Sequence, residues 1–187
     1  MHIPTKRHRK DEKRIQENSS KIYTNVAAPI QHAAITAYEP NKEIEEYMNT
    51  TRQIHRIMGQ YTSEEFNKID GLKATTPQGA FYFFLDFNDL KDDLKRKGVK
   101  TSNELMHSLI SDPHHIATVT GDACMINPDN YGARIAFVDY DGKKTYDNYT
   151  KDPPKTKSDE QHFAKENAPL MVKGIEALKN YIRYITS

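Results

Sequence analysis

The sequence predicts an α+β fold in which helices cover a small sheet. Two long segments carry apolar residues at helical spacing, and three short runs are rich in aromatic or β-branched residues. Glycine and proline separate these runs, as they do between the elements of a compact domain. The predicted order along the chain is helix, strand, helix, strand, strand, helix.

Length and charge limit the possible classes of protein. The chain has 187 residues, enough for one domain or slightly more, and its 27 Lys and Arg against 26 Asp and Glu give a net charge of +1. This balance removes any global electrostatic argument for nucleic acid or an anionic membrane as partner. One cysteine excludes an intramolecular disulfide, and no apolar run approaches the roughly 20 residues of a transmembrane helix. We therefore expect a cytoplasmic protein.

The N-terminal segment differs in composition from the rest, because it is rich in Lys and Arg and has few apolar residues. We expect residues 1–20 to be a basic N-terminal helix or a frayed end, and residues 21–187 to be the folded domain. A nucleic-acid-binding arm is the alternative reading. It is disfavoured because no aromatic residues lie between the charges for bases to stack on.

The first strong helical pattern begins at Asn41. Apolar residues recur there at steps of three or four, which predicts a long amphipathic helix to about Gln60. After Pro77, the run 80–87 is short, aromatic and bounded by turn residues. It predicts a strand that is buried on both faces.

A short helix and two more strands are predicted next. Thr101 and Glu104 have the spacing of a capping box and precede apolar residues that predict a helix. Residues 116–120 and 133–140 are β-branched or aromatic enough to be strands. We expect the strand at 133–140 to lie beside the strand at 80–87, because these are the two most apolar candidates.

The C-terminal part begins with a polar stretch. Residues 142–167 contain a Pro-Pro pair and scattered lysines, and we expect an exposed loop that is long for a compact domain. Pro169 then suits the first turn of a helix. The apolar residues from Met171 to Ile185 step by four and three along one face, which predicts a final amphipathic helix.

The usual motifs of catalytic or metal-binding chemistry are missing from the sequence. The histidines are scattered and no His-x-x-x-His pair shares a helix face with a carboxylate, so we expect no metal site. We expect His114 and His115 at a surface turn. Cys124 is expected to be a small buried hydrophobe, since a lone cysteine does not indicate a nucleophile. No glycine-rich phosphate loop is present.

Arg134 is the residue that this pattern leaves unexplained. It lies inside the apolar segment 133–138, where an uncompensated buried guanidinium would be costly. It therefore needs an anionic partner. That partner is either a carboxylate of the same chain or an anionic group that enters a cavity from outside.

Three segments carry a resemblance that bears on Arg134. They are Pro-Ile-Gln-His-Ala-Ala at 29–34, Pro-Gln-Gly-Ala-Phe-Tyr-Phe-Phe at 77–84, and Gly-Ala-Arg-Ile-Ala-Phe-Val-Asp-Tyr-Asp-Gly at 132–142. In this order they resemble the C-terminal part of class I/II pyridoxal-phosphate aminotransferases, over the chain from about Ser20 to its end. The resemblance implies the small domain of a fold type I enzyme, with a mostly antiparallel sheet covered by helices.

The resemblance also implies roles for individual residues. In that family an arginine at the position of Arg134 binds the α-carboxylate of the substrate through two parallel hydrogen bonds, which a guanidinium allows and a lysine does not. The segment with Tyr23, Thr24 and Asn25 is similar to one that approaches the active site of the neighbouring subunit, which implies a dimer. The implied cofactor is pyridoxal phosphate, and the implied substrates are an amino acid and a 2-oxo acid.

The family's large domain, which should precede this region, is not recognised in the sequence. It would supply the lysine that forms the Schiff base, the acid that pairs with the pyridine nitrogen, and the groups that bind the phosphate. Lys21 follows Ser19 and Ser20 in a pattern like that of the cofactor lysine. However, it lies eight residues before Pro29, where the family has a few dozen, so we expect a solvated lysine.

We therefore expect a truncated or split aminotransferase that is inactive alone and does not hold pyridoxal phosphate covalently. No catalytic residue is assigned, and the chain would need a large-domain partner chain or a second copy of itself. The alternative is a non-catalytic carboxylate-binding or protein-interaction domain that kept the fold and a pocket at Arg134.

Overall fold

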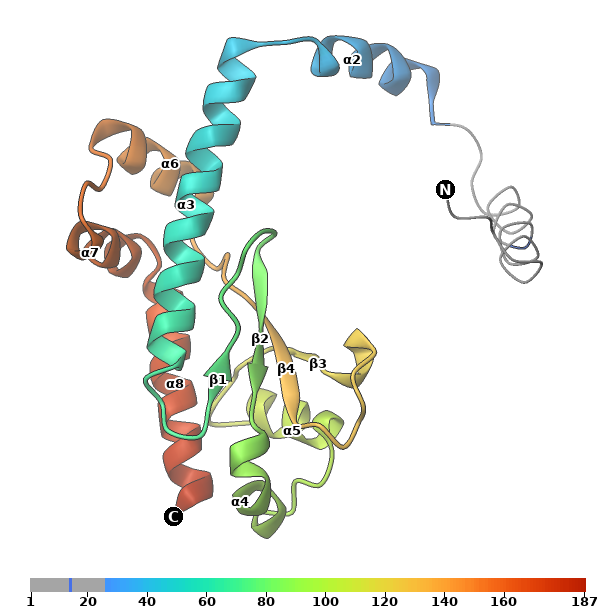
Figure 1. The fold of residues 1–187 in the computed structure, drawn as a ribbon, viewed down its shortest axis with the longest axis vertical. Helices are drawn as coiled ribbons and strands as arrows, with labels where there is room; N and C mark the ends of the chain where they lie inside the picture. The colour runs from blue at the N-terminus through green and yellow to red at the C-terminus, as the bar shows by residue number, and fades with distance from the viewer. Residues whose placement is uncertain (1–13, 15–25) are drawn as a thin grey trace, which may run out of the picture. The chain divides into compact units, whose positions relative to one another are not determined.

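The structure is a computed structural model that describes Arg14 and residues 26–187, which belong to two units divided after Glu43. The first unit contains helix α2 (Ala28–Tyr38) (Figure 1). A proline lies in its first turn, a position that proline favours. The sequence pattern does not predict this helix, because its apolar residues are not confined to one face. The second unit, Ile44–Ser187, contains the remaining elements apart from the first two residues of the next helix.

Helix α3 (Lys42–Phe66) is the long helix predicted from Asn41, but it continues past Gln60 to Phe66. Phe66 is buried, and its ring centroid lies 5.9 Å from that of Phe83 in the sheet. This aromatic contact stabilises the additional turn. The helix packs on the core through its C-terminal half, where Ile57 is 2% exposed.

The sheet has four antiparallel strands in the order β1-β2-β4-β3 (Figure 1). Their bounds are β1 (Lys73–Ala74), β2 (Tyr82–Asp86), β3 (Val119–Thr120) and β4 (Gly132–Ala136). The predicted pairing of the two apolar strands is confirmed, with Phe84 opposite Arg134. The α+β class and the small antiparallel sheet are therefore confirmed, and the short edge strand β1 is an addition.

The prediction that the strand at 80–87 is buried on both faces is wrong. Along β2, Phe83 and Leu85 are buried, whereas Tyr82 is exposed and Phe84 is only half-buried. The physical reason is that aromatic residues occupy both faces, while the core forms against one of them. An unbroken apolar run does not distinguish a strand that is buried on both faces from a strand that is buried on one.

Helix α5 (Ser102–Ile110) confirms the predicted cap, because the Thr101 side chain accepts a hydrogen bond from the backbone N–H of Glu104. The Glu104 carboxylate accepts from the backbone N–H of Lys100 instead of that of Thr101, so only half of the capping box forms. Three short elements complete this region, namely η1 (Asn88–Leu90), α4 (Lys91–Arg96) and η2 (Asp122–Cys124).

The expected exposed loop at 142–167 is replaced by two helices, α6 (Gly142–Lys151) and α7 (Lys157–Asn167). The Thr156 side chain accepts from the backbone N–H of Asp159, and the Asp159 carboxylate accepts from that of Thr156, which makes a complete capping box. Phe163 anchors α7 in the core. Good caps and a few apolar contacts are therefore enough to stabilise the two helices, and their polar residues face the solvent.

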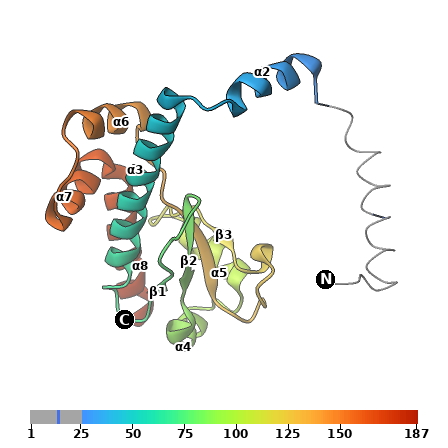
Figure 2. The same cartoon turned by 45° about the horizontal axis from the view of Figure 1, so that its top comes forward.

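The final helix, α8 (Pro169–Thr186), is the predicted amphipathic helix and lies beside the C-terminal half of α3 (Figures 1 and 2). The predicted stripe from Met171 to Ile185 is buried, and Tyr181 joins it in the same core as the inner face of the sheet. Among the described residues, no helix is long and apolar enough to cross a membrane.

Candidate functional site: the open face of the sheet

Strand alternation places Arg134 on the face of the sheet opposite the core. Ala133, which precedes it, and Phe137, which follows the strand, are on the core side and are each 1% exposed, whereas Arg134 is half-buried. Its partners in register, Phe84 on β2 and Val119 on β3, are also half-buried. We call this surface, with Tyr82, Phe84, Val119, Gly132 and Arg134, the open face.

Gly132 keeps one end of the open face flat. A Cβ at this position would lie 2.3 Å from two carbons of the Phe84 ring, far inside van der Waals contact. The ring of Phe84 also lies 3.4 Å from where a Cβ of Gly121 would stand. The two glycines therefore allow the Phe84 ring to lie across the strands beside Arg134.

Tyr82 is the group that holds the Arg134 side chain. The guanidinium carbon lies 4.7 Å from the centroid of the Tyr82 ring, within the range of a cation–π contact. Among the described residues, no Asp or Glu lies within ion-pair distance of Arg134. The internal carboxylate pair that the sequence left open is therefore absent from the described part of the chain.

The turn before β2 is fixed against α3. Gly59 on α3 has no side chain, and a Cβ there would lie 2.8 Å from Pro77 and 2.9 Å from Phe137. Ala80 takes a left-handed backbone conformation with φ of 56°, which is uncommon for a residue with a side chain. This turn directs Phe81, 49% exposed, edge-on against the ring of Tyr82 at 5.2 Å between centroids.

Several residues singled out from the sequence lie away from the open face or outside the described residues. Tyr23, Thr24, Asn25 and Lys21 are among the residues that the structure does not describe. The segment 29–34 lies in α2, in the first unit.

The histidines and the cysteine do not gather into a site. Among residues 14 and 26–187, no three His, Cys, Asp or Glu side chains are placed to hold a metal ion. His115 is exposed, as expected for a surface turn, whereas His114 is half-buried with its ring edge-on to Tyr181 at 5.0 Å. Cys124 is half-buried and unbonded, so the expectation of a buried cysteine is met only in part.

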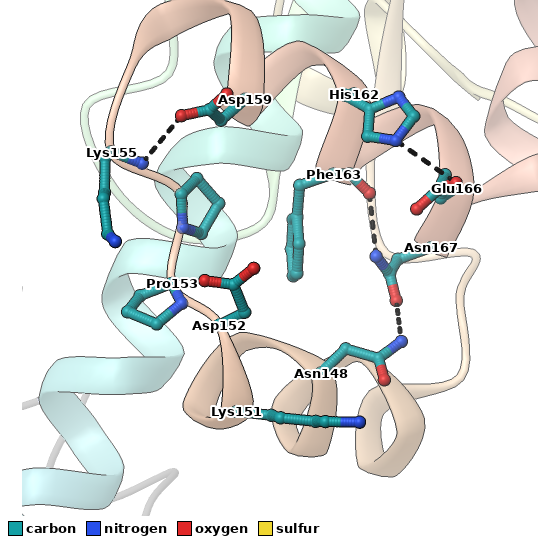
Figure 3. Close-up of a pocket in the computed structure, with 11 residues that line it drawn as sticks. Asn148, Lys151, Asp152, Pro153, Lys155, Asp159, His162, Phe163, Glu166 and Asn167 are labelled. Carbon is teal, nitrogen blue, oxygen red and sulfur yellow. Dashed lines mark hydrogen bonds and ion pairs between the residues drawn. The ribbon is translucent and has the colours of Figure 1, made fainter.

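A polar cavity of about 590 Å³ lies between α6 and α7 (Figure 3). Phe163 points into it, and Asn167 is held in its wall by hydrogen bonds with Asn148 at 2.7 Å and with the Phe163 carbonyl at 2.9 Å. The His162 ring lies 3.2 Å from the Glu166 carboxylate at the exposed rim. These contacts fasten α6 to α7, and both lysines and carboxylates line the cavity, so it does not select one sign of charge.

One pair of residues that no sequence pattern indicates is His55 on α3 and Tyr140 after β4. The His55 Nδ1 atom lies 3.3 Å from the Tyr140 hydroxyl, and burial lowers the pKa of His55 and raises that of Tyr140. The two residues are 85 positions apart, so no local motif joins them. The one signal in the sequence is that His55 directly follows Ile54, a residue of the apolar stripe of α3, and so lies at the edge of the buried face.

The family of the chain follows from comparison with the sequence models of known families. The sequence model of the family "Aminotransferase class I and II" matches residues 12–139, which is more than half of the chain. The chain belongs to the aminotransferase class I and II family. The match includes Arg134 and the whole sheet of this aminotransferase-family chain, and it ends before α6, α7 and α8.

Two relatives show how much of an aminotransferase the chain spans. It is 23% identical to the aspartate aminotransferase of Sulfolobus acidocaldarius over 126 residues, which are 67% of this chain and 29% of that protein. The crystal structure of the aspartate aminotransferase from Rhizobium meliloti is similar over 75% of this chain and 30% of its own, with 18% identity and a TM-score of 0.42. The chain thus spans less than a third of either relative.

Proposed function

We propose that this chain binds the α-carboxylate of an amino acid or 2-oxo acid, as part of a pyridoxal-phosphate-dependent aminotransferase. The observation that carries the proposal is the state of Arg134, a half-buried guanidinium on the open face with no carboxylate partner among the described residues. A carboxylate ligand would satisfy this group with two parallel hydrogen bonds.

The surroundings of Arg134 suit that role. Strand β4 is hydrogen-bonded on both sides, by β2 and β3, so the backbone of Arg134 is rigid. The Tyr82 ring restricts the guanidinium to one side. A group held in this way loses less conformational freedom when a ligand binds, which favours affinity.

Members of the family use pyridoxal phosphate, which when bound supplies the electron sink for transfer of the amino group. The described strands contain one lysine, Lys73 on the edge strand β1, and it pairs with Asp89 at 2.7 Å. The open face therefore offers a carboxylate-binding group and no lysine for a Schiff base. We assign no cofactor-binding residue here, and propose that a large-domain partner chain or a second copy contributes the rest of the active site.

The direct test is titration of the chain with 2-oxoglutarate, followed by calorimetry and by NMR of the arginine Nε–H signals. Since a charge-assisted hydrogen bond contributes about 1.5–3 kcal/mol, Arg134→Lys should weaken binding roughly tenfold to a hundredfold. Arg183→Lys on α8 is the matched control and should bind as the unchanged chain does. Equal affinity of the Arg134 variant and the control would refute the proposed role.

The alternative is a non-catalytic carboxylate-binding or interaction domain. The observation that favours it is the continuous core of the second unit, which joins the inner face of the sheet to α3, α5 and α8.

Sedimentation and thermal melting of a dilute sample distinguish the part of an aminotransferase from the self-sufficient binding domain. We expect self-association or binding of an apolar dye, because Phe81, Tyr82 and the start of α3 expose apolar side chains. A stable monomer with a sharp melt and no dye binding favours the alternative.

A further inference from the structure

A groove along α3 is explained neither by family membership nor by Arg134. Two cavities of about 540 Å³ each adjoin there, and both are lined by Thr51 and His55. One extends towards the start of α6, and the other extends towards the turn at residues 77–80. Each has the size of a small-molecule site, for which roughly 300–1,000 Å³ is typical.

Aromatic rings form much of the lining. In the first cavity, Tyr47 and Tyr146 approach each other with ring centroids 5.5 Å apart, and Tyr140 lies in the same wall. Phe81 and Phe137 line the second cavity. Such rings favour a flat aromatic ligand, which stacks on their faces or edges, over an aliphatic ligand of the same size.

The charges in the groove are all of one sign. Lys143 lines the first cavity, Arg52 and Arg56 line the second, and neither lining contains Asp or Glu. This contrasts with the cavity between α6 and α7, whose lining includes both signs. A cationic rim without carboxylates is complementary to an anionic ligand.

Arg52 is the cation with the least internal engagement. Lys143 pairs with Asp147 at 2.6 Å and Arg56 pairs with Glu160, whereas Arg52 donates one hydrogen bond to Asn49 at 3.0 Å. No ion pair of Arg52 is present among the described residues. Its charge is therefore available to a ligand in the second cavity.

His55 lies at the junction of the two cavities and three residues after Arg52, on the same side of the helix. Its Nδ1 atom faces Tyr140, and its ring lies edge-on to Phe137 with centroids 6.3 Å apart. The described residues place no partner on Nε2, which leaves this nitrogen for a polar group of a ligand.

We propose that this groove binds a small aromatic carboxylate, with the ring of the ligand among the aromatic side chains and its carboxylate at Arg52 and His55. The site is separate from Arg134 and does not depend on the proposed aminotransferase function. It is built partly from α6, which lies beyond the residues that the family model matches.

The test uses 3-phenylpropionate as the probe, with calorimetry and NMR of the His55 ring signals of the full chain. We expect saturable binding that shifts the His55 signals, and binding at least tenfold weaker for 3-phenylpropanamide and for 3-cyclohexylpropionate. The first analogue removes the negative charge and the second removes the aromatic ring. Equal binding of all three compounds, or no binding of the probe, would overturn the proposal.

Two arginine variants locate the site. Arg52→Gln should weaken binding of the probe at least tenfold, whereas Arg183→Gln should not change it. Arg183 is a close control, because it also donates to an asparagine three residues earlier, Asn180 at 3.2 Å, and lies outside the groove. A thermal melt verifies that each variant is folded. Loss of binding in Arg134→Gln with unchanged binding in Arg52→Gln would place the probe on the open face and refute the groove.

Discussion

The two faces of the sheet are made from the same strands, yet they have opposite physical characters. The inner face presents Phe83, Leu85 and Ala133, each 4% exposed or less, to a continuous core. The open face presents Tyr82, 39% exposed, and Arg134, whose guanidinium contacts the Tyr82 ring. The inner face is buried in the core, whereas the open face keeps Tyr82 and Arg134 partly accessible.

The difference teaches that one residue step along a strand separates a core position from a position on the open face. Leu85 and Phe84 are adjacent in sequence, but Leu85 is 0% exposed and Phe84 is half-buried. Because side chains alternate between faces, a substitution at one of two neighbouring positions should affect folding and a substitution at the other should affect binding. Leu85→Ala and Arg134→Ala test this separation, and Gly132→Ala tests the packing of the open face itself.

The largest effect is expected for Leu85→Ala on the inner face. Removal of a fully buried leucine leaves a cavity and should lower the free energy of unfolding by roughly 2–5 kcal/mol. Tyr82→Ala on the open face is the matched control in the same strand, and should cost about 1 kcal/mol or less. Urea unfolding followed by circular dichroism measures both. Similar losses in the two variants would show that both faces are packed.

An intermediate effect is expected for Gly132→Ala. The added methyl group would collide with the Phe84 ring, and displacement of that ring should cost about 1–3 kcal/mol of stability. The double variant Gly132→Ala/Phe84→Ala removes the collision. We expect it to lose less stability than the sum of the two single variants, as measured in a urea-unfolding cycle. Strict additivity would contradict the contact.

The smallest effect on stability is expected for Arg134→Ala. The side chain makes a cation–π contact with Tyr82, and such contacts contribute about 0.5–1 kcal/mol at accessible sites. The free energy of unfolding should therefore fall by about 1 kcal/mol or less, although binding of a carboxylate should be lost. A fall in stability as large as that of Leu85→Ala would mean that Arg134 serves the fold instead of a ligand.

Most features of the fold that were predicted correctly form through interactions between residues close together in the chain. Local signals predicted the Thr101 cap of α5 and the stripe of α8. One long-range feature, the pairing of the two apolar strands, was also predicted, because these were the two most apolar candidates. The helices at 142–167 were missed because their polar composition resembles a loop, although Thr156 and Asp159 have the spacing of a capping box. A capping motif was thus present in the sequence, but the apolar residues that anchor α7 in the core are only two, Phe163 and Ala164.

The sequence by itself determined the α+β class and the order of most elements, and it singled out Arg134 as a candidate, because periodicity, caps and an arginine in an apolar segment are local properties. The tertiary structure decided which face of β2 was buried, that the Tyr82 ring contacts the Arg134 guanidinium, and that His55 meets Tyr140. These outcomes depend on which segments pack together across long separations in the chain, and alternation or helical period alone contains no information about that choice.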